Sequence, residues 1–138
     1  MLYDDRMTTN VESLLRQHLE ARGDLAAAWL FGSHARGTAS TDSDVDVGVL
    51  FLEDPPRTLE GLHLDLQDDL RGALGRPVDL VVMNRAPADL VHRILRDGVL
   101  LVEHDRSRRV RFEVRKRAEY FDLLPILRQY RRWPPKHA

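Results

Sequence analysis

The sequence contains no cysteine, which excludes structural disulfides and thiolate-ligated zinc sites. It also has no apolar run near the length of about 20 residues that a membrane-spanning helix needs, and its first residues lack a signal-peptide pattern. Internal repeats and low-complexity linkers are lacking as well. We therefore expect a cytoplasmic protein, and the 138 residues fit one domain better than two.

Net charge is almost absent, at −1 for the whole chain, but the charges are unevenly distributed. Residues 106–138 hold 11 of the 21 Lys and Arg residues and only three carboxylates, so this segment carries +8. Residues 1–105 carry −9. The sequence thus divides into an acidic body and a basic tail, and this distribution needs a physical explanation.

The sequence features that are present centre on residues 31–47. Residues 26–31 form an apolar run of strand length that stops at Gly32-Ser33. After a polar connection, apolar and other residues alternate over positions 45–52, a period typical of a strand with one apolar face. Asp44 and Asp46 are two positions apart and therefore project from the same side of that strand.

Two carboxylates this close repel each other, and a divalent cation removes the repulsion. Oxygen ligands suit Mg²⁺, which takes water and substrate phosphates as its other ligands. Gly32 would let a phosphate approach the backbone, and Ser33 adds a hydroxyl and an amide donor. Each feature alone has a structural explanation, because aspartates often begin strands and Gly-Ser often ends them. Together they favour a phosphate cradle beside a metal site, as in-line transfer at phosphorus requires.

This pattern resembles a known family. Gly-Ser at 32–33, Arg-Gly at 36–37 and Ser-Asp-Val-Asp at 43–46 look like the signature of polymerase-β-type nucleotidyltransferases. The chain is similar in particular to their minimal (MNT) branch, small proteins encoded beside HEPN-domain toxins in toxin–antitoxin pairs. The resemblance implies an α/β (α+β) fold with a mixed sheet of about four strands, flanking helices and a basic C-terminal helix. Residues 1–105 would be the minimal nucleotidyltransferase domain, and residues 106–138 its basic helical extension.

The resemblance also implies the site residues. It places a third carboxylate on a later strand, and Asp79 in the run 77–82 is our candidate. If this strand lies beside residues 45–52, Asp79 can join Asp44 and Asp46 around one pair of metal ions. Asp79 could instead be the general base, or an edge carboxylate without function. The catalytic and metal-binding set is Asp44, Asp46 and Asp79, and the nucleotide-binding set is Gly32, Ser33, Arg36 and Ser43.

The resemblance implies transfer of AMP from ATP, with two Mg²⁺ ions, to a tyrosine of a cognate HEPN ribonuclease toxin. The expected partners are ATP and the toxin, in a hetero-oligomer, without a membrane. Mn²⁺ also accepts oxygen ligands, so the choice of metal stays open. Two alternatives are an antitoxin that acts by binding alone and a small-molecule transferase of the aminoglycoside-modifying kind. The intact carboxylates argue against the first, and the lack of room for a separate acceptor domain argues against the second.

Hydrophobic periodicity predicts the remaining elements. A first helix opens at Thr9-Asn10 with a capping box to Glu12, and a second runs over residues 58–74. The run 78–83 is continuously apolar, which favours a central strand. A helix over 87–97 and an edge strand over 99–103 follow.

The basic tail reads as a helix over residues 107–130, with Pro125 expected to kink or restart it. Its predicted inward-facing stripe consists of Val110, Val114, Phe121 and Leu124. Arginines on the other faces could contact nucleic-acid phosphates, but no nucleic-acid-binding motif accompanies them. We favour a solvated basic helix or one that docks on an acidic partner.

Overall fold

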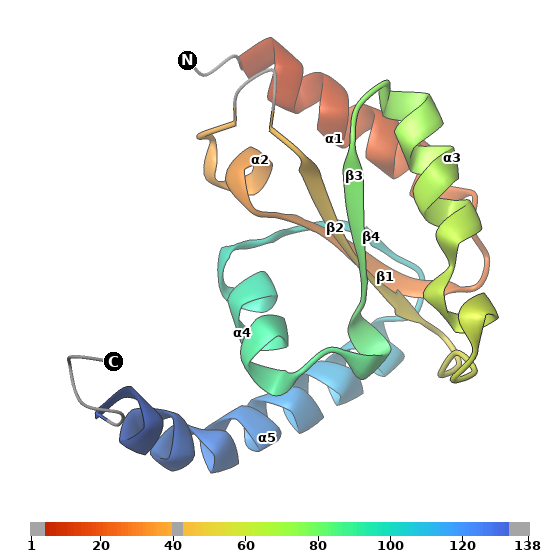
Figure 1. Ribbon diagram of the computed structural model, residues 1–138. Helices are drawn as coiled ribbons and strands as arrows, with labels where there is room; N and C mark the ends of the chain where they lie inside the picture. Colours follow the sequence, from red (N-terminus) through yellow and green to blue (C-terminus); the bar gives the residue numbers. More distant parts are fainter. Residues whose placement is uncertain (1–4, 40–42, 133–138) are drawn as a thin grey trace.

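The computed structural model describes residues 5–39 and 43–132 (Figure 1). Helices and strands alternate along the chain. In order they are α1 (Asp5–Glu20), β1 (Leu25–Phe31), α2 (Ser33–Arg36), β2 (Val45–Phe51), η1 (Leu59–Leu62), α3 (Leu64–Leu74), β3 (Val78–Val82), η2 (Met83–Arg85), α4 (Ala88–Asp97), β4 (Val99–Glu103) and α5 (Arg106–Arg132). Within the described residues, no helix is long and apolar enough to cross a bilayer.

The strands form one mixed sheet in the order β3-β2-β1-β4. β1 is antiparallel to both β2 and β4, whereas β3 is parallel to β2. The predicted mixed sheet of four strands is confirmed, and so is the edge position of β4. The central position predicted for residues 78–83 is wrong, because β3 occupies the other edge.

Helix α3 explains why an edge strand has the sequence of a central one. The Leu80 N–H points away from β2 and donates to Oε1 of Gln67 at 3.0 Å, and Arg71 Nε donates to the Val78 carbonyl at 3.3 Å. Side chains of α3 therefore satisfy the edge that a further strand would otherwise pair with. Since β3 also contributes to the packing on both faces of the sheet, its sequence stays apolar apart from Asp79.

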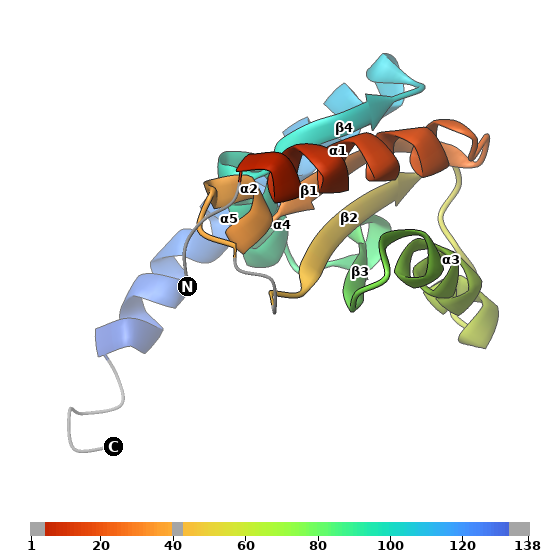
Figure 2. The same cartoon turned by 90° about the horizontal axis from the view of Figure 1, so that it is seen from above.

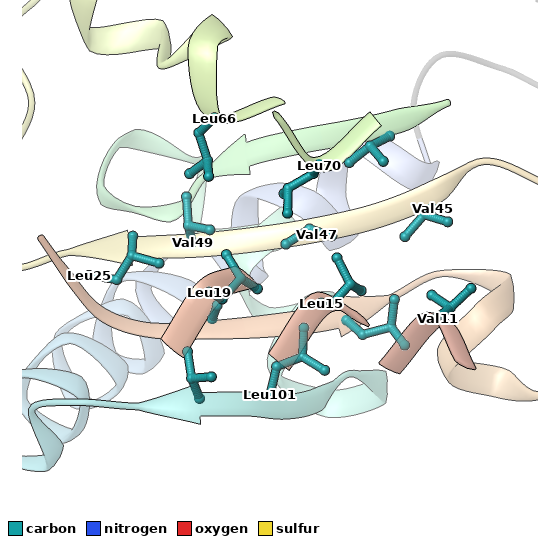
Figure 3. Packing of buried hydrophobic residues seen from close by; sticks show 14 of the residues in the cluster. Val11, Leu15, Leu19, Leu25, Val45, Val47, Val49, Leu66, Leu70 and Leu101 are labelled. Atoms are coloured by element: carbon teal, nitrogen blue, oxygen red, sulfur yellow. The ribbon is translucent and has the colours of Figure 1, made fainter. Parts of the chain in front are cut away.

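Helices cover both faces of the sheet (Figures 1 and 2). On one face, leucines of α1 and α3 pack on the valines of β2 (Figure 3). On the other face, α4 and α5 contribute to a second core that includes Trp29, Met83, Ile94 and Phe112. Because helices cover both faces of the sheet, we expect a polar ligand-binding site at the ends of the strands.

Two helix boundaries differ from the sequence prediction. α1 begins at Asp5, so Thr9 and Asn10 lie inside the helix and the capping box is wrong. The helix predicted over residues 58–74 is divided at His63, whose φ of 51° ends η1 before α3 starts. The His63 ring stacks on Phe51 with ring centres 3.9 Å apart, a long-range contact that hydrophobic periodicity does not encode.

Helix α5 also differs from its prediction. It continues through Pro125 as one helix, so the predicted restart is wrong. The buried anchor is Phe112, which is 1% exposed, whereas Val110, Val114 and Phe121 of the predicted inward stripe are exposed. Positions 110 and 112 lie about 160° apart around a helix, so burial of Phe112 turns Val110 toward solvent.

Candidate active site

The turn after β1 is built on two glycines in backbone conformations that other residues rarely adopt. Gly32 has φ 74° and ψ −153°, and Gly37, which ends α2, has φ 74° and ψ 22°. Between them the Ser33 carbonyl accepts hydrogen bonds from the Gly37 N–H and, at 3.0 Å, from the Thr38 N–H. Among the described residues none forms a hydrogen bond with the Ser33 hydroxyl, which leaves it available to a ligand.

Gly32 is in direct contact with the predicted metal ligand Asp46. A Cβ atom on Gly32 would collide with Oδ2 of Asp46, so only glycine fits here with this carboxylate in place. The contact brings the turn with Ser33 and the carboxylate of β2 together, although they are 13 positions apart in the chain. Phosphate-binding and metal-binding residue types are therefore neighbours in space, as the sequence predicts.

Sheet register adds the third carboxylate. Asp46 lies opposite Phe31 of β1 on one side and opposite Asp79 of β3 on the other. The predicted condition that Asp79 lies on a strand beside residues 45–52 is thus met. Asp44 is exposed in the segment just before β2. All three aspartates stand where β1 ends and where β2 and β3 begin.

The electrostatics show that these carboxylates act on one another. Burial raises the pKa of Asp46, and the negative charges of Asp79 and Asp44 raise this pKa further. The guanidinium of Arg36 opposes them by lowering the same pKa. Arg36 also contributes to lowering the pKa of Asp97 at the end of α4, so its charge acts on both the site and that helix. A cation bound beside Asp46 would relieve the repulsion.

The carboxylates of the site suit a Mg²⁺ ion that also binds substrate oxygens. They fit less well a metal ion whose ligands all come from the protein. Within residues 5–39 and 43–132, no three His, Asp or Glu side chains converge tightly enough to hold an ion. Mg²⁺ characteristically binds one or two carboxylates and completes its shell with water and phosphate oxygens. Asp44 and Asp46 offer such a pair, and the ligand roles of all three aspartates stay predictions.

His34 is a residue of this site that the sequence analysis did not single out. It follows Ser33 in α2 and is buried, with Nε2 at 3.4 Å from the Ser43 carbonyl oxygen and 3.3 Å from Nη1 of Arg76. Burial lowers the pKa of His34; the Ser43 carbonyl opposes this, and the charge of Arg76 adds to it. His34 thus connects the turn after β1 with the backbone just before Asp44. A single histidine in a polar stretch gives no signal of this burial.

Comparisons with known proteins agree with this geometry. Residues 13–107 match the family model described as polymerase beta, nucleotidyltransferase. The protein adenylyltransferase MntA of Thermococcus cleftensis is 36% identical over 92 residues, which are 64% of this chain and 90% of that protein.

Solved structures share the fold. A crystal structure of a toxin–antitoxin complex with AMP-PNP superimposes with a TM-score of 0.72 at 25% identity, over 86% of this chain and 94% of that one. The MNT antitoxin in complex with a tri-AMPylated HEPN toxin of Shewanella oneidensis gives 0.63 at 22% identity, over 90% and 92%. The resemblance inferred from the motif is confirmed: the chain belongs to the polymerase-β nucleotidyltransferase family.

Proposed function

We propose that this chain is a protein adenylyltransferase that transfers AMP from ATP to a tyrosine hydroxyl of a HEPN-domain ribonuclease toxin and thereby acts as an antitoxin. The observation that carries the proposal is the position of Asp46, packed against Gly32 and in register with Asp79. The names of two similar proteins support a protein as the acceptor of AMP. The relative from T. cleftensis is named a protein adenylyltransferase, and the complex with AMP-PNP is a toxin–antitoxin pair.

The turn after β1 would hold the triphosphate. Gly32 has no side chain, so a phosphate can reach the backbone amides beside it. The Ser33 hydroxyl would donate to a β- or γ-phosphate oxygen. Arg36 is exposed and its charge acts at Asp46, so its guanidinium can offset phosphate charge at the same place. Ser43 would contribute through the backbone next to Asp44.

Asp44 and Asp46 would bind a pair of Mg²⁺ ions together with phosphate oxygens, and Asp79 would complete the acceptor side. Bound there, Mg²⁺ would neutralise charge on the phosphates and on the leaving group. The carboxylates would act on the nucleotide through these ions, because carboxylates and phosphates repel each other directly. His34 would keep the backbone before Asp44 in place, because its buried ring extends from α2 to the Ser43 carbonyl.

In the transfer step the tyrosine oxygen forms a bond to the α-phosphorus of ATP. The bond from the α-phosphorus to the oxygen that bridges it to the β-phosphate breaks, and pyrophosphate leaves with that electron pair. The phenolic proton passes to the carboxylate of Asp79, which is exposed on the edge strand and free to meet an incoming protein. Replacing Asp79 by Asn should therefore lower kcat more than it weakens ATP binding.

The test uses the purified protein, Mg²⁺, ATP labelled at the α-phosphate and the HEPN-domain protein encoded beside it. Label should appear on a tyrosine of the HEPN protein and be lost in the variant Asp44→Ala/Asp46→Ala. A matched control is Asp65→Ala/Asp68→Ala, which removes two exposed carboxylates of α3 and should label normally.

Other outcomes overturn the proposal. If no label appears and the wild type and the Asp44/Asp46 variant neutralise the toxin equally, the chain is an antitoxin that acts by binding. If label passes to an aminoglycoside and not to the protein, the chain is a small-molecule transferase.

A further inference from the structure

The second half of α5 extends beyond the rest of the protein. Its first half is held by the buried ring of Phe112, by a 3.1 Å hydrogen bond from Lys116 Nζ to the Ala86 carbonyl, and by stacking of Tyr120 on His92 at 3.8 Å. Among the described residues, positions 121–130 make no hydrogen bond, ion pair or ring contact with another element. Figures 1 and 2 show this half running past α4 and away from the sheet.

This extension is too apolar for a helix that stays in water. Residues 120–127 read Tyr-Phe-Asp-Leu-Leu-Pro-Ile-Leu, with Asp122 as their single charged residue. Phe121, Ile126 and Tyr130 are 60%, 62% and 69% exposed. Phe121 and Ile126 lie about 140° apart around the helix axis, so apolar side chains face more than one direction. A helix with this distribution is normally enclosed on several sides.

The charges around the extension are positive and unpaired. Arg117 and Arg128 flank its apolar run, residues 120–127, and neither forms an ion pair with a described carboxylate. Nearer the start of α5, two arginines are used internally: Arg108 pairs with Asp54, and Arg109 pairs with Glu103 and Glu113. A surface that encloses residues 120–130 must therefore offer an apolar groove with carboxylates at its rim.

The extension also projects from the end of the molecule that carries the aspartates. Lys116 lies beside Ala86, before α4, and Tyr120 lies beside His92 within α4, so the two helices run in the same direction. α4 ends next to Val99, which lies opposite Leu30 near the end of β1. α5 therefore runs toward the end of the sheet at which β1 ends and α2 begins (Figure 1).

We propose that residues 120–130 of α5 are the docking element for the protein that receives AMP. The partner encloses this helix in an apolar groove with an acidic rim, and the docked partner presents its hydroxyl at Asp46 and Asp79. The identity of the partner rests on the proposed function. A membrane surface fits less well, because an interfacial helix keeps its apolar residues on one face, whereas here they point to several. Helix-in-groove binding accounts for both the apolar composition and the flanking arginines.

The test replaces Phe121 and Ile126 by Asp and measures the Kd for the HEPN-domain protein encoded beside the chain. The matched control is Leu59→Asp/Leu62→Asp, because these η1 leucines are also exposed, at 80% and 51%, and lie away from α5. We expect the α5 variant to bind about 100-fold more weakly or worse, and the control to change less than about twofold. kcat/KM for AMP transfer should fall in parallel, while binding of AMP-PNP and the helix content by circular dichroism stay unchanged.

The outcomes separate this inference from the proposed function. If the α5 variant binds and labels the HEPN protein as the wild type does, the docking element lies elsewhere while the transferase function stands. If the wild type binds through α5 but transfers no label, the docking inference stands and the proposed function fails. Two further results would overturn the inference. One is an α5-dependent dimer of this chain with unchanged partner binding. The other is α5-dependent binding to vesicles of phosphatidylcholine with 30% phosphatidylserine instead of to the partner.

Discussion

Gly32 and Asp46 depend on each other at the scale of single residues. We predict that Gly32→Ala abolishes nucleotidyl transfer and lowers the free energy of unfolding by about 1–3 kcal/mol. The methyl group would collide with Oδ2 of Asp46, and the positive φ of 74° is unfavourable for alanine. Activity with labelled ATP and urea denaturation measure the two effects.

Gly72→Ala is the control for this change. Gly72 lies within α3, where a Cβ would meet no atom within 4 Å, and alanine favours a helix. This variant should keep full activity and gain about 0.5–1 kcal/mol of stability. If both variants lost activity to the same extent, close contact at Gly32 would not be the cause.

Asp46 illustrates a conflict between stability and chemistry. Its partly buried carboxylate lies near the charges of Asp44 and Asp79, so the protein without a cation carries unrelieved repulsion. We predict that Asp46→Asn raises the Tm measured in EDTA and eliminates transfer. Mg²⁺ with AMP-PNP should raise the Tm of the wild type and have little effect on the variant. A lower Tm of the variant in EDTA would show that Asp46 is not under electrostatic strain.

At the scale of elements, the strands are the best predicted, because alternation of apolar residues with a period of two identifies them. The alternation over residues 45–52 and the apolar run before Gly32 identify β2 and β1, and they place two aspartates at one end of the sheet. From the sequence, Asp79 could be placed beside Asp46 only on the condition that its strand lies next to residues 45–52. Strand order itself is set by packing between distant segments, which the sequence does not show. β3 shows the limit, since side chains of Gln67 and Arg71 satisfy an edge that the sequence makes look central.

The helices were less predictable, because tertiary contacts determine their ends and faces. Stacking of His63 on Phe51 accompanies the break between η1 and α3, and no local residue pattern signals it. In α5 two apolar faces compete for the core, and Phe112 is buried in place of the stripe that contains Val110 and Phe121. The prediction chose the wrong face because α5 carries apolar residues on more than one face and the rest of the domain buries only the face with Phe112.

The connection after β2 gives a pH-dependent prediction. Oδ1 of Asp54 accepts hydrogen bonds from Asn84 Nδ2 at 3.0 Å and from Arg108 Nη2 at 3.1 Å, and Asn84 also binds the backbone of Phe51. The Asn84 hydrogen bond, and then the charge of Arg108, lower the pKa of Asp54. Because the folded-state pKa is below the unfolded one, this stabilisation is present above the unfolded pKa and is lost as pH falls through the folded pKa.

Asp54→Asn should therefore lower the free energy of unfolding at pH 7, by less than about 1 kcal/mol because the side chain is largely exposed. The difference from the wild type should decline as pH falls below the ordinary aspartate pKa of about 4, and it should vanish only below the lowered folded-state pKa of Asp54. Urea denaturation at pH 7 and at pH 3 measures it. The control is Asp68→Asn, on an exposed carboxylate 3.8 Å from Arg71, which should change the free energy of unfolding at pH 7 by less than Asp54→Asn does.

At the scale of the whole molecule, the uneven charge acquires a role. The start of α5 uses its arginines to hold the helix on the acidic body, through Arg108 with Asp54 and Arg109 with Glu103. Arg117 and Arg128, which form no ion pair with a described carboxylate, are the charges that we assign to an external partner. The basic tail thus combines an internal attachment with an external electrostatic surface, and the two halves of α5 divide these tasks.

This division predicts how the chain meets its acceptor. Opposite charges mainly raise the rate of association and make it sensitive to salt. Arg117→Glu/Arg128→Glu should lower kon for the HEPN protein about tenfold or more at low salt, flatten the dependence of kon on salt, and change koff less. The control Arg57→Glu/Arg85→Glu makes the same change in net charge on exposed residues outside α5. Stopped-flow association from low to high salt compares them. Equal slowing by both variants would mean that overall charge attracts the partner and that α5 does not direct it toward the aspartates at the start of β2 and β3.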